Sequence, residues 1–427
     1  MRVLTKKKEV SAFLRILQRR STALNEECEK RVKAILDDVR RNGDRAVLKY
    51  TRIYDSIRLK DFRITSREIA EHAERAERKV VRSLKVSAAR IRKFHKMQKE
   101  RSWFFSEGNS VMGQLIIPLE RVGVYAPGGK ASYPSTVLMN IIPAQVAGVR
   151  EIALCVPSPK GELNPYVMAA IKLTGIEEVY KIGGAQAVGA MAYGTETIKK
   201  VDKITGPGNI YVATAKRMVF GEVDIDMIAG PSEILIVADN VANPAVIAAD
   251  LLSQAEHDEF ASSILITDSE GLADSVRREL KIQLRNLKRN EIAGRSLENF
   301  GAIILMEDIE EALELANRIA PEHLEIITRN PGKLLPLIRN AGAIFLGIWT
   351  PEALGDYAAG PNHILPTGGT ARFSSPLGVY DFVKRSSLLN FTKNGFKKLA
   401  RTVKTVSEAE GLEAHGNTIR VRERLLS

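Results

Sequence analysis

The stretch Arg121-Val-Gly-Val-Tyr-Ala-Pro-Gly-Gly129 decides the fold class of this 427-residue chain. A short apolar strand, Arg121 to Tyr125, runs directly into a glycine-rich loop. The same arrangement recurs at Val179 to Gln186 and at Lys203 to Asn209, with helical runs in between. Strands that alternate with helices predict a parallel sheet, and the loops at the carboxyl ends of its strands are the usual place for a ligand.

The glycine-rich loops leave the nature of that ligand open. Gly206-Pro-Gly-Asn-Ile-Tyr211 begins like a dinucleotide fingerprint, but its sixth position is tyrosine rather than glycine or alanine. A single Gly-x-Gly at a strand end is often an ordinary tight turn. Three such loops together make a ligand of the nucleotide type as plausible as ordinary tight turns, and no P-loop or serine nucleophile elbow is present.

A second series of strands follows, with helices in between: Ile234 to Ala238, Ile264 to Thr267, Ala302 to Met306, Leu324 to Thr328 and Ala343 to Leu346. We therefore expect an α/β protein with two incomplete Rossmann-like domains, parallel-rich sheets and helical arms at both ends. The expected parts are an N-terminal arm (1–20), a larger catalytic domain (21–124 with 234–377), a nucleotide-binding domain (125–233) and a C-terminal tail (378–427). The arm and the tail lack a core of their own and are expected to lie on a partner subunit.

Charge is distributed unevenly along the chain. The formal net charge is +12, and the first 110 residues carry 30 basic against 15 acidic side chains. A nucleic-acid-binding protein is one interpretation of this excess. However, acids and bases alternate at helical spacing between Glu71 and Lys79, which is typical of a solvated helix face, so attraction of anionic ligands is the better interpretation.

No apolar run reaches the length of a membrane-spanning helix, and the first 20 residues do not resemble a secretory signal. The two cysteines, Cys28 and Cys155, are too few for a disulfide framework and lack metal-ligand spacing. The expected location is the cytoplasm.

The stretch Leu251-Leu-Ser-Gln-Ala-Glu-His-Asp258 follows a helical run. It places Gln254 and His257 three residues apart, on one face of a helix. An amide oxygen beside an imidazole nitrogen can form half of a metal site, although a solvated polar helix end is the plainer alternative. Most of the six histidines lie in the C-terminal part of the chain, beside acids, amides or glycines, which favours a function.

Three further motifs combine acids with histidines: Ala320-Pro-Glu-His-Leu-Glu325, Gly355-Asp-Tyr-Ala-Ala-Gly-Pro-Asn-His363 and Glu410-Gly-Leu-Glu-Ala-His-Gly-Asn417. Adjacent Glu322 and His323 can both handle protons, since burial and neighbours tune each pKa. Salt-bridged or solvated loops are the alternatives. Nitrogen and oxygen ligands without thiolate suit zinc, manganese or cobalt. The hypothetical ligand set is Gln254, His257, Asp356 and His415.

Together these motifs resemble the histidinol dehydrogenase family. The resemblance rests on segments that follow one another in family order over nearly the whole chain: Val122-Gly-Val-Tyr-Ala-Pro-Gly-Gly129, Thr205-Gly-Pro-Gly-Asn209, Ala229-Gly-Pro-Ser-Glu233, Gln254-Ala-Glu-His-Asp258, Pro321-Glu-His-Leu-Glu325, Gly355 to His363, Phe373-Ser-Ser-Pro-Leu377 and Glu410-Gly-Leu-Glu-Ala-His415. No motif position departs from the family pattern.

The resemblance implies zinc-dependent oxidation of L-histidinol to L-histidine through bound L-histidinal, with two NAD per turnover, in the final steps of histidine biosynthesis. His323 would be the base, and Glu322 would activate the water that hydrates the aldehyde. The remaining implied roles are zinc ligands (Gln254, His257, Asp356, His415; one zinc per subunit), substrate contacts (Ser232, Gln254, His257, His323, Asp356, His363, Glu410, His415) and NAD contacts (Tyr125, Gln186, Asn209). The resemblance also implies a homodimer in which one active site is built from two chains.

Two alternatives remain. A relative on the same scaffold could oxidise another polar alcohol, such as a sulfonated diol, although Ser232, His363 and Glu410 match the histidinol type. A protein that binds nucleic acid or anions through its basic first quarter would show binding that weakens steeply with salt and survives metal chelation.

Overall fold

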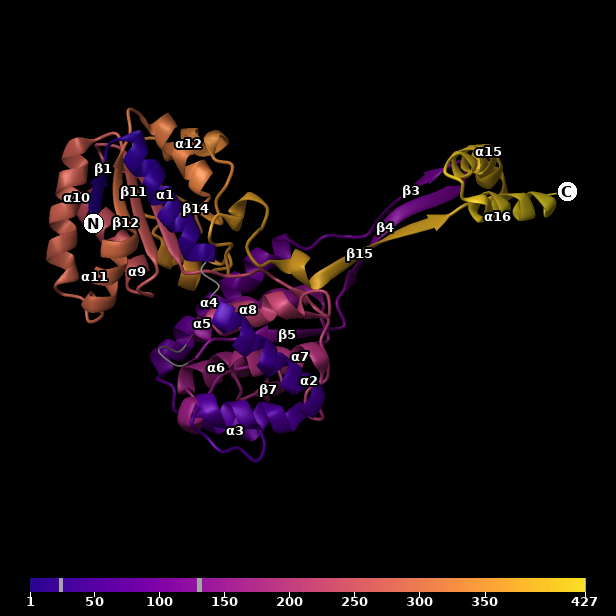
Figure 1. The fold of residues 1–427 in the computed structure, drawn as a ribbon, viewed down its shortest axis with the longest axis horizontal. Coiled ribbons are helices and arrows are strands. Elements are labelled where there is room, and N and C mark those ends of the chain that lie inside the picture. Colours follow the sequence, from indigo (N-terminus) through magenta and orange to yellow (C-terminus); the bar gives the residue numbers. More distant parts are fainter. Residues whose placement is uncertain (23–25, 129–132, 427) are drawn as a thin grey trace. The chain divides into compact units, whose positions relative to one another are not determined.

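The computed structural model describes residues 1–22, 26–128 and 133–426 (Figure 1). Gly129, the last residue of the first motif, lies outside the described residues. The chain divides into two compact units, Met1–Gln98 with Glu120–Phe382 and Lys99–Leu119 with Val383–Ser427. Among the described helices, none is both long and apolar enough to cross a membrane.

The first unit contains sheet A, in which all strands are parallel. In chain order these strands are β1 (Arg2–Leu4), β10 (Glu233–Ala238), β11 (Ser262–Thr267), β12 (Gly301–Leu305), β13 (His323–Ile327) and β14 (Ala343–Leu346). Their order across the sheet is β1-β12-β11-β10-β13-β14. Successive side chains of β10 face opposite cores, because strand residues alternate between the two faces of a sheet.

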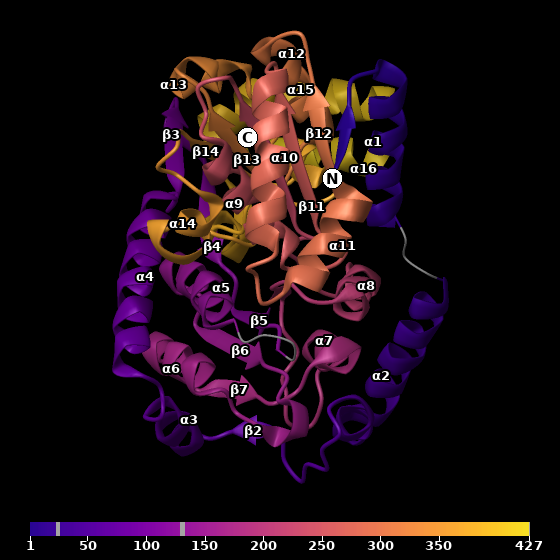
Figure 2. The ribbon, with the colours of Figure 1, turned by 90° about the vertical axis from the view of Figure 1, so that its left-hand side faces the viewer.

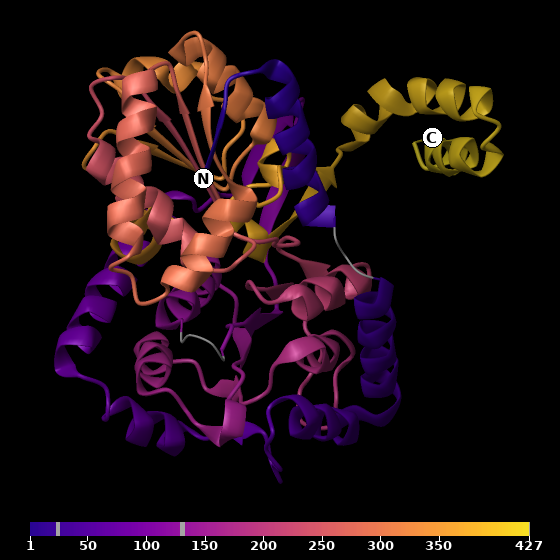
Figure 3. The ribbon, with the colours of Figure 1, turned by 60° about the vertical axis from the view of Figure 1, so that its left-hand side comes forward.

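Helices cover both faces of sheet A (Figure 3). One face packs against α9 (Pro244–Ala255), α10 (Glu270–Leu284) and α11 (Asn290–Phe300). The other face packs against α1 (Lys7–Thr22) and α12 (Ile309–Ile319). A central sheet buried on both sides explains the continuous apolar runs of its strands.

Sheet B, also in the first unit, repeats the arrangement (Figure 2). Its strands are β2 (Arg63–Ile64), β5 (Arg121–Tyr125), β6 (Glu151–Cys155), β7 (Glu178–Tyr180), β8 (Lys203–Thr205) and β9 (Asp224–Ile225), in the order β2-β7-β6-β5-β8-β9. Only β2 is antiparallel to its neighbour. The surrounding helices are α2 (Glu26–Tyr54), α3 (Ser66–Ala73), α4 (Arg78–Met97), α5 (Pro134–Ala147), α6 (Pro165–Thr174), α7 (Gly184–Tyr193) and α8 (Ile210–Val219).

The strand orders confirm the predicted α/β class with parallel-rich sheets. In each sheet the five strands that alternate with helices lie in the order third, second, first, fourth, fifth, as in doubly wound folds. Shorter elements complete the first unit: η1 (Pro159–Gly161), α13 (Pro331–Leu334), η2 (Leu335–Leu337), α14 (Glu352–Leu354), η3 (Gly355–Ala359), η4 (Thr370–Arg372) and η5 (Val379–Phe382).

The N-terminal arm (1–20) was expected to be helical and to lie on a partner subunit. In the structure its first residues form β1, which extends sheet A beside β12, and Val10 and Phe13 of α1 are buried against this sheet of the same chain. A three-residue strand is too short to give a recognisable alternation in the sequence.

The segment 21–124 was expected to share one domain with 234–377. It contributes instead to sheet B, because β2 pairs with β7 and β5 pairs with β6. Hydrophobic periodicity shows that a helix or strand has an apolar face but not which sheet covers it. The sequence pattern therefore could not assign this segment to a sheet.

The second unit combines the C-terminal tail with an earlier hairpin. Strands β3 (Trp103–Glu107), β4 (Ser110–Pro118) and β15 (Val383–Asn390) form an antiparallel sheet in the order β15-β4-β3. Two helices follow, α15 (Lys393–Ala409) and α16 (Glu413–Arg424). The side chains of Trp103, Phe104 and Phe105 are each about half exposed.

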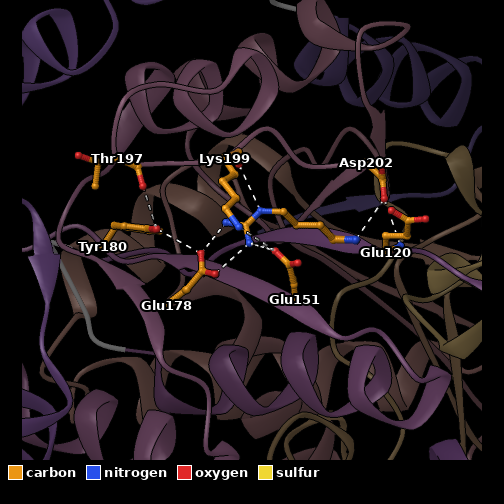
Figure 4. A network of polar contacts seen from close by, with 8 residues as sticks. Glu120, Glu151, Glu178, Tyr180, Thr197, Lys199 and Asp202 are labelled. Atoms are coloured by element: carbon orange, nitrogen blue, oxygen red, sulfur yellow. Dashed lines mark hydrogen bonds and ion pairs between the residues drawn. The ribbon is translucent and has the colours of Figure 1, made fainter.

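A buried arginine ties together the beginnings of three strands of sheet B (Figure 4). Arg121 donates to Glu151 at 2.6 Å and to Glu178 at 2.9 and 2.5 Å, and its Nε donates to the carbonyl oxygen of Lys199 at 3.3 Å. The guanidinium lowers the pKa of Glu178, since its hydrogen bond stabilises the carboxylate. The network lies at the amino ends of β5, β6 and β7, opposite the glycine-rich loops, so its role is structural.

We predict that Arg121→Met lowers the free energy of unfolding by about 2 kcal/mol, because two partly exposed carboxylates lose a buried partner. A lowered pKa of Glu178 means that its share of this stability is present above pH 4.5 and is lost as pH falls through the folded-state value. The variant should therefore also lose stability less steeply on acidification. Denaturant titrations from pH 3 to 7 test this. Lys199→Met, at a largely exposed side chain, is the control and should cost under about 0.5 kcal/mol; an equal effect of both variants contradicts the prediction.

Candidate active site

A group of acids and imidazoles gathers at the amino-terminal edge of sheet A. His323 is the first residue of β13 and Glu233 is the first residue of the adjacent strand β10. Helix α9 runs antiparallel to these strands and ends at the same edge, where it brings Gln254 and the following His257. Open α/β sheets usually bind ligands at the opposite edge, so this placement had to come from the structure.

His323 is held through one ring nitrogen and leaves the other without a hydrogen bond. Its Nδ1 lies 2.9 Å from the carbonyl oxygen of Glu233, which can only accept, so Nδ1 carries the proton in the neutral ring. Its Nε2 is buried without a hydrogen-bond partner and lies 3.5 Å from a carboxylate oxygen of Asp356. The free lone pair of Nε2 is what a general base needs.

Glu322, like His323, is held in place by the backbone of Glu233. One of its carboxylate oxygens accepts from the backbone nitrogen of Glu233 at 2.8 Å and lies 3.7 Å from Nδ1 of His323. Glu233 in turn forms an ion pair with Arg20 of α1. One residue of β10 therefore positions both members of the Glu322–His323 pair, through its N–H and its carbonyl.

Burial and mutual charge shift the pKa values of this pair. Burial raises the pKa of Glu322 to about 8. Burial alone would lower the pKa of His323, but the carboxylates of Glu352, Glu322 and Asp356 outweigh it and raise the pKa well above its ordinary value, so the neutral, basic ring requires a cation that compensates these carboxylates. A carboxyl group whose pKa lies near neutrality can take up and release protons at physiological pH.

The geometry also fits a metal ion. One ligand atom each of His323, Glu352 and Asp356 lies within 4.8 Å of the others, although only Asp356 among them belongs to the expected ligand set. Burial lowers the pKa of His257 and outweighs the opposite effect of the Asp356 carboxylate, which favours the neutral, ligating form. An excess of buried carboxylates over cations is the environment that a divalent cation would neutralise.

Gln254 and Glu352 lie in contact at this site. The Gln254 side chain is 1% exposed, and its amide nitrogen, when turned toward Glu352, donates to the two carboxylate oxygens at 2.6 and 2.8 Å. Sequence reasoning missed Glu352. Its spacing of four residues from Asp356 was the signal that could have found it, since such residues share a helix face.

Ser232 and His363 lie on segments that border this group. His363 contacts the carbonyl oxygen of Asp356 through Nδ1 at 3.0 Å and the hydroxyl of Thr136 on α5 through Nε2 at 3.2 Å. Ser232 leads into β10, and its carbonyl accepts from the backbone nitrogen of Ser262 at 3.0 Å. The structure thus brings Gln254, His257, Glu322, His323, Asp356 and His363 into one neighbourhood.

The three residues expected to contact NAD lie at the carboxyl ends of sheet B strands. Tyr125 ends β5, and its hydroxyl accepts from the backbone nitrogen of Gly184 at 3.2 Å. Asn209 caps the amino end of α8, where its side-chain oxygen accepts from the backbone nitrogens of Tyr211 and Val212 at 3.1 and 3.2 Å, and the positive end of the helix dipole there favours a phosphate. Gln186 is buried, and its Oε1 has no hydrogen-bond partner. An unpaired buried acceptor in the first turn of α7, the helix that follows β7, fits a ligand that donates a hydrogen bond.

Gly206 shows why one of these loops needs glycine. Its φ is +112°, and a Cβ there would lie 2.0 Å from the carbonyl oxygen of Tyr125.

Two residues expected at the site, Glu410 and His415, belong to the second unit. Glu410 is the C-cap residue of α15, His415 lies in the first turn of α16, and both side chains are exposed.

Comparisons with known proteins identify the family of the chain. The family model described as histidinol dehydrogenase matches residues 18–423. The histidinol dehydrogenase of Aquifex aeolicus is 54% identical over 412 residues, which cover 96% of each chain. That of Geobacter metallireducens is 54% identical over 400 residues, covering 93% of this chain and 92% of the relative.

A solved structure gives the same result for the fold. The crystal structure of histidinol dehydrogenase from Elizabethkingia anophelis superimposes with a TM-score of 0.95 at 38% identity, covering 100% of this chain and 98% of that one. The chain therefore belongs to the histidinol dehydrogenase family, oxidoreductases that oxidise histidinol in histidine biosynthesis.

Proposed function

We propose that this chain is a zinc- and NAD-dependent enzyme that oxidises L-histidinol to L-histidine through bound L-histidinal, with two NAD per turnover. The observation that carries the proposal is the buried His323, with Nδ1 bonded to a backbone carbonyl and Nε2 unpaired among carboxylates. Gln254, His257 and Asp356 would hold zinc together with His415. Bound zinc would supply a Lewis acid that holds the substrate and compensates the buried carboxylates.

The chain's own residues would move the protons. In the first oxidation, Nε2 of His323 would take the proton of the substrate hydroxyl. Glu322 would then accept a proton from the water that adds to the aldehyde. Bound NAD would supply the hydride acceptor for both oxidations. The raised pKa of Glu322, to about 8, supports its role as a proton carrier near neutrality.

NAD would bind at the carboxyl edge of sheet B, within the proposed nucleotide-binding segment 125–233. Tyr125, Gln186 and Asn209 are its proposed contacts, and Ser232, His363 and Glu410 are proposed to contact the substrate. The unpaired buried oxygen of Gln186 and the positive dipole end of α8 beside Asn209 support the NAD contacts.

Because Glu410 and His415 lie in a small unit with exposed aromatic and aliphatic side chains, we propose that this unit docks on a second copy of the chain. Each active site of the homodimer would then combine Glu322 and His323 of one subunit with Glu410 and His415 of the other.

The stoichiometry of NADH tests the overall reaction. Metal-loaded protein should form about two NADH per L-histidinol, and activity should disappear on chelation and return with zinc. Turnover of another polar alcohol with none of histidinol would contradict the substrate assignment. Activity that survives complete chelation would contradict the role of the metal.

Separate substitutions test the two proton carriers. His323→Asn should slow oxidation of histidinol by about 10²- to 10⁴-fold, and Glu322→Gln should slow conversion of supplied histidinal by a similar factor, with a smaller effect on the first hydride transfer. Single-turnover measurements with each substrate give the rates, and each variant is the control for the other. Equal losses in both steps for both variants would contradict the division of roles.

Mixing inactive chains tests the shared site. His415→Ala and His323→Asn chains, unfolded and refolded together, should recover about a quarter of wild-type activity, since half of the dimers are mixed and each has one intact site of two. Each variant refolded alone is the control. Activity that stays at the sum of the two controls would place His323 and His415 of one site in the same chain.

A further inference from the structure

Gln254 must turn the correct end of its amide toward the metal, a requirement that a histidine or carboxylate ligand does not have. An amide has an acceptor oxygen at one end and two N–H donors at the other, and only the oxygen can face a cation. The two orientations have nearly the same shape, so packing around this buried side chain selects neither. A hydrogen-bond partner is needed to decide which end faces the metal.

Glu352 supplies that partner. Its two oxygens lie 2.6 and 2.8 Å from the amide nitrogen of Gln254 when that nitrogen faces them. In the opposite orientation the amide oxygen faces only acceptors and the nitrogen faces only donors. An ionised carboxylate accepts only, so it stabilises one orientation and destabilises the other.

Glu352 is itself held firmly in place. It is 3% exposed and begins α14, where its backbone nitrogen donates to a carboxylate oxygen of Glu325 at 2.7 Å. Glu325 lies in the middle of β13, with hydrogen-bonded strands on both sides, and is 1% exposed. A rigid strand therefore fixes the carboxylate that contacts Gln254.

We propose that Glu352 is a positioning residue that directs the Gln254 oxygen toward the metal and acts on the metal through this amide. The proposal rests on the zinc site proposed above. Partners of this kind outside the ligand set usually change metal affinity by about 10- to 100-fold when they are removed.

A double-mutant cycle on zinc affinity tests the proposal. The full-length metal-free proteins compete with a chromogenic chelator for zinc: wild type, Gln254→Ala, Glu352→Gln and the double variant. Glu352→Gln should weaken zinc binding about 10- to 100-fold in the wild-type background. In the Gln254→Ala background it should change affinity by less than roughly 2-fold, because the group through which it acts is gone.

Three results would overturn the proposal. If the fold losses of zinc affinity in the two single variants multiply in the double variant, Glu352 is a ligand in its own right. If Glu352→Gln binds zinc as tightly as the wild type, Glu352 has no role. The control Asp250→Asn removes a partly buried carboxyl group that acts electrostatically on Glu352. If Asp250→Asn weakened zinc binding as much as Glu352→Gln does, the effect of Glu352 would come from its charge alone and not from its contact with Gln254.

A second variant covers the case in which Glu352→Gln does not fold. Glu352→Asp keeps the charge but withdraws the carboxylate by one methylene, and it should also weaken zinc binding; unchanged affinity would contradict a positional role. Absence of zinc binding by the wild type would instead overturn the proposed metal site. The two proposals therefore fail in different ways.

Discussion

The hydrogen bond between Nδ1 of His323 and the carbonyl oxygen of Glu233 is the contact on which the candidate site depends. It exists because β10 and β13, distant in sequence, are neighbouring parallel strands that begin at the same level. The same residue offers its N–H to Glu322. The sheet register thus fixes Glu322 and His323 through hydrogen bonds to backbone atoms, and no flexible loop is needed to place either group.

The second constraint is electrostatic. Burial raises the pKa of Glu325 to about 9 and that of Glu352 to about 7, and the carboxyl group of Asp250 adds to both shifts. Buried acids destabilise a fold when they are left ionised and unpaired. A divalent cation at this edge of sheet A would offset that cost, so metal binding and stability should be coupled. The proposed orientation of Gln254 by Glu352 would use one of these acids to prepare the site.

The sequence predicted the α/β class from the strand, loop and helix alternation, and the strand orders confirm it. It also identified residues that the structure brings together, including Gln254, His257 and His323. It could not assign 21–124 to a sheet, because the apolar face of an amphipathic helix does not show which sheet the helix packs against. Glu352 was missed because it begins a three-residue helix and has no partner nearby in sequence except Asp356. The edge of the sheet at which the site lies depends on strand register, which a single sequence does not contain.

The most direct test of the account is the location of bound zinc in the full-length protein, by anomalous diffraction at the zinc edge. The account predicts one zinc per chain at the amino-terminal edge of sheet A, with the oxygen of Gln254, a nitrogen of His257 and a carboxylate oxygen of Asp356 at about 2.0–2.2 Å. A zinc peak elsewhere, or coordination that includes Glu352 but not Gln254, would contradict it.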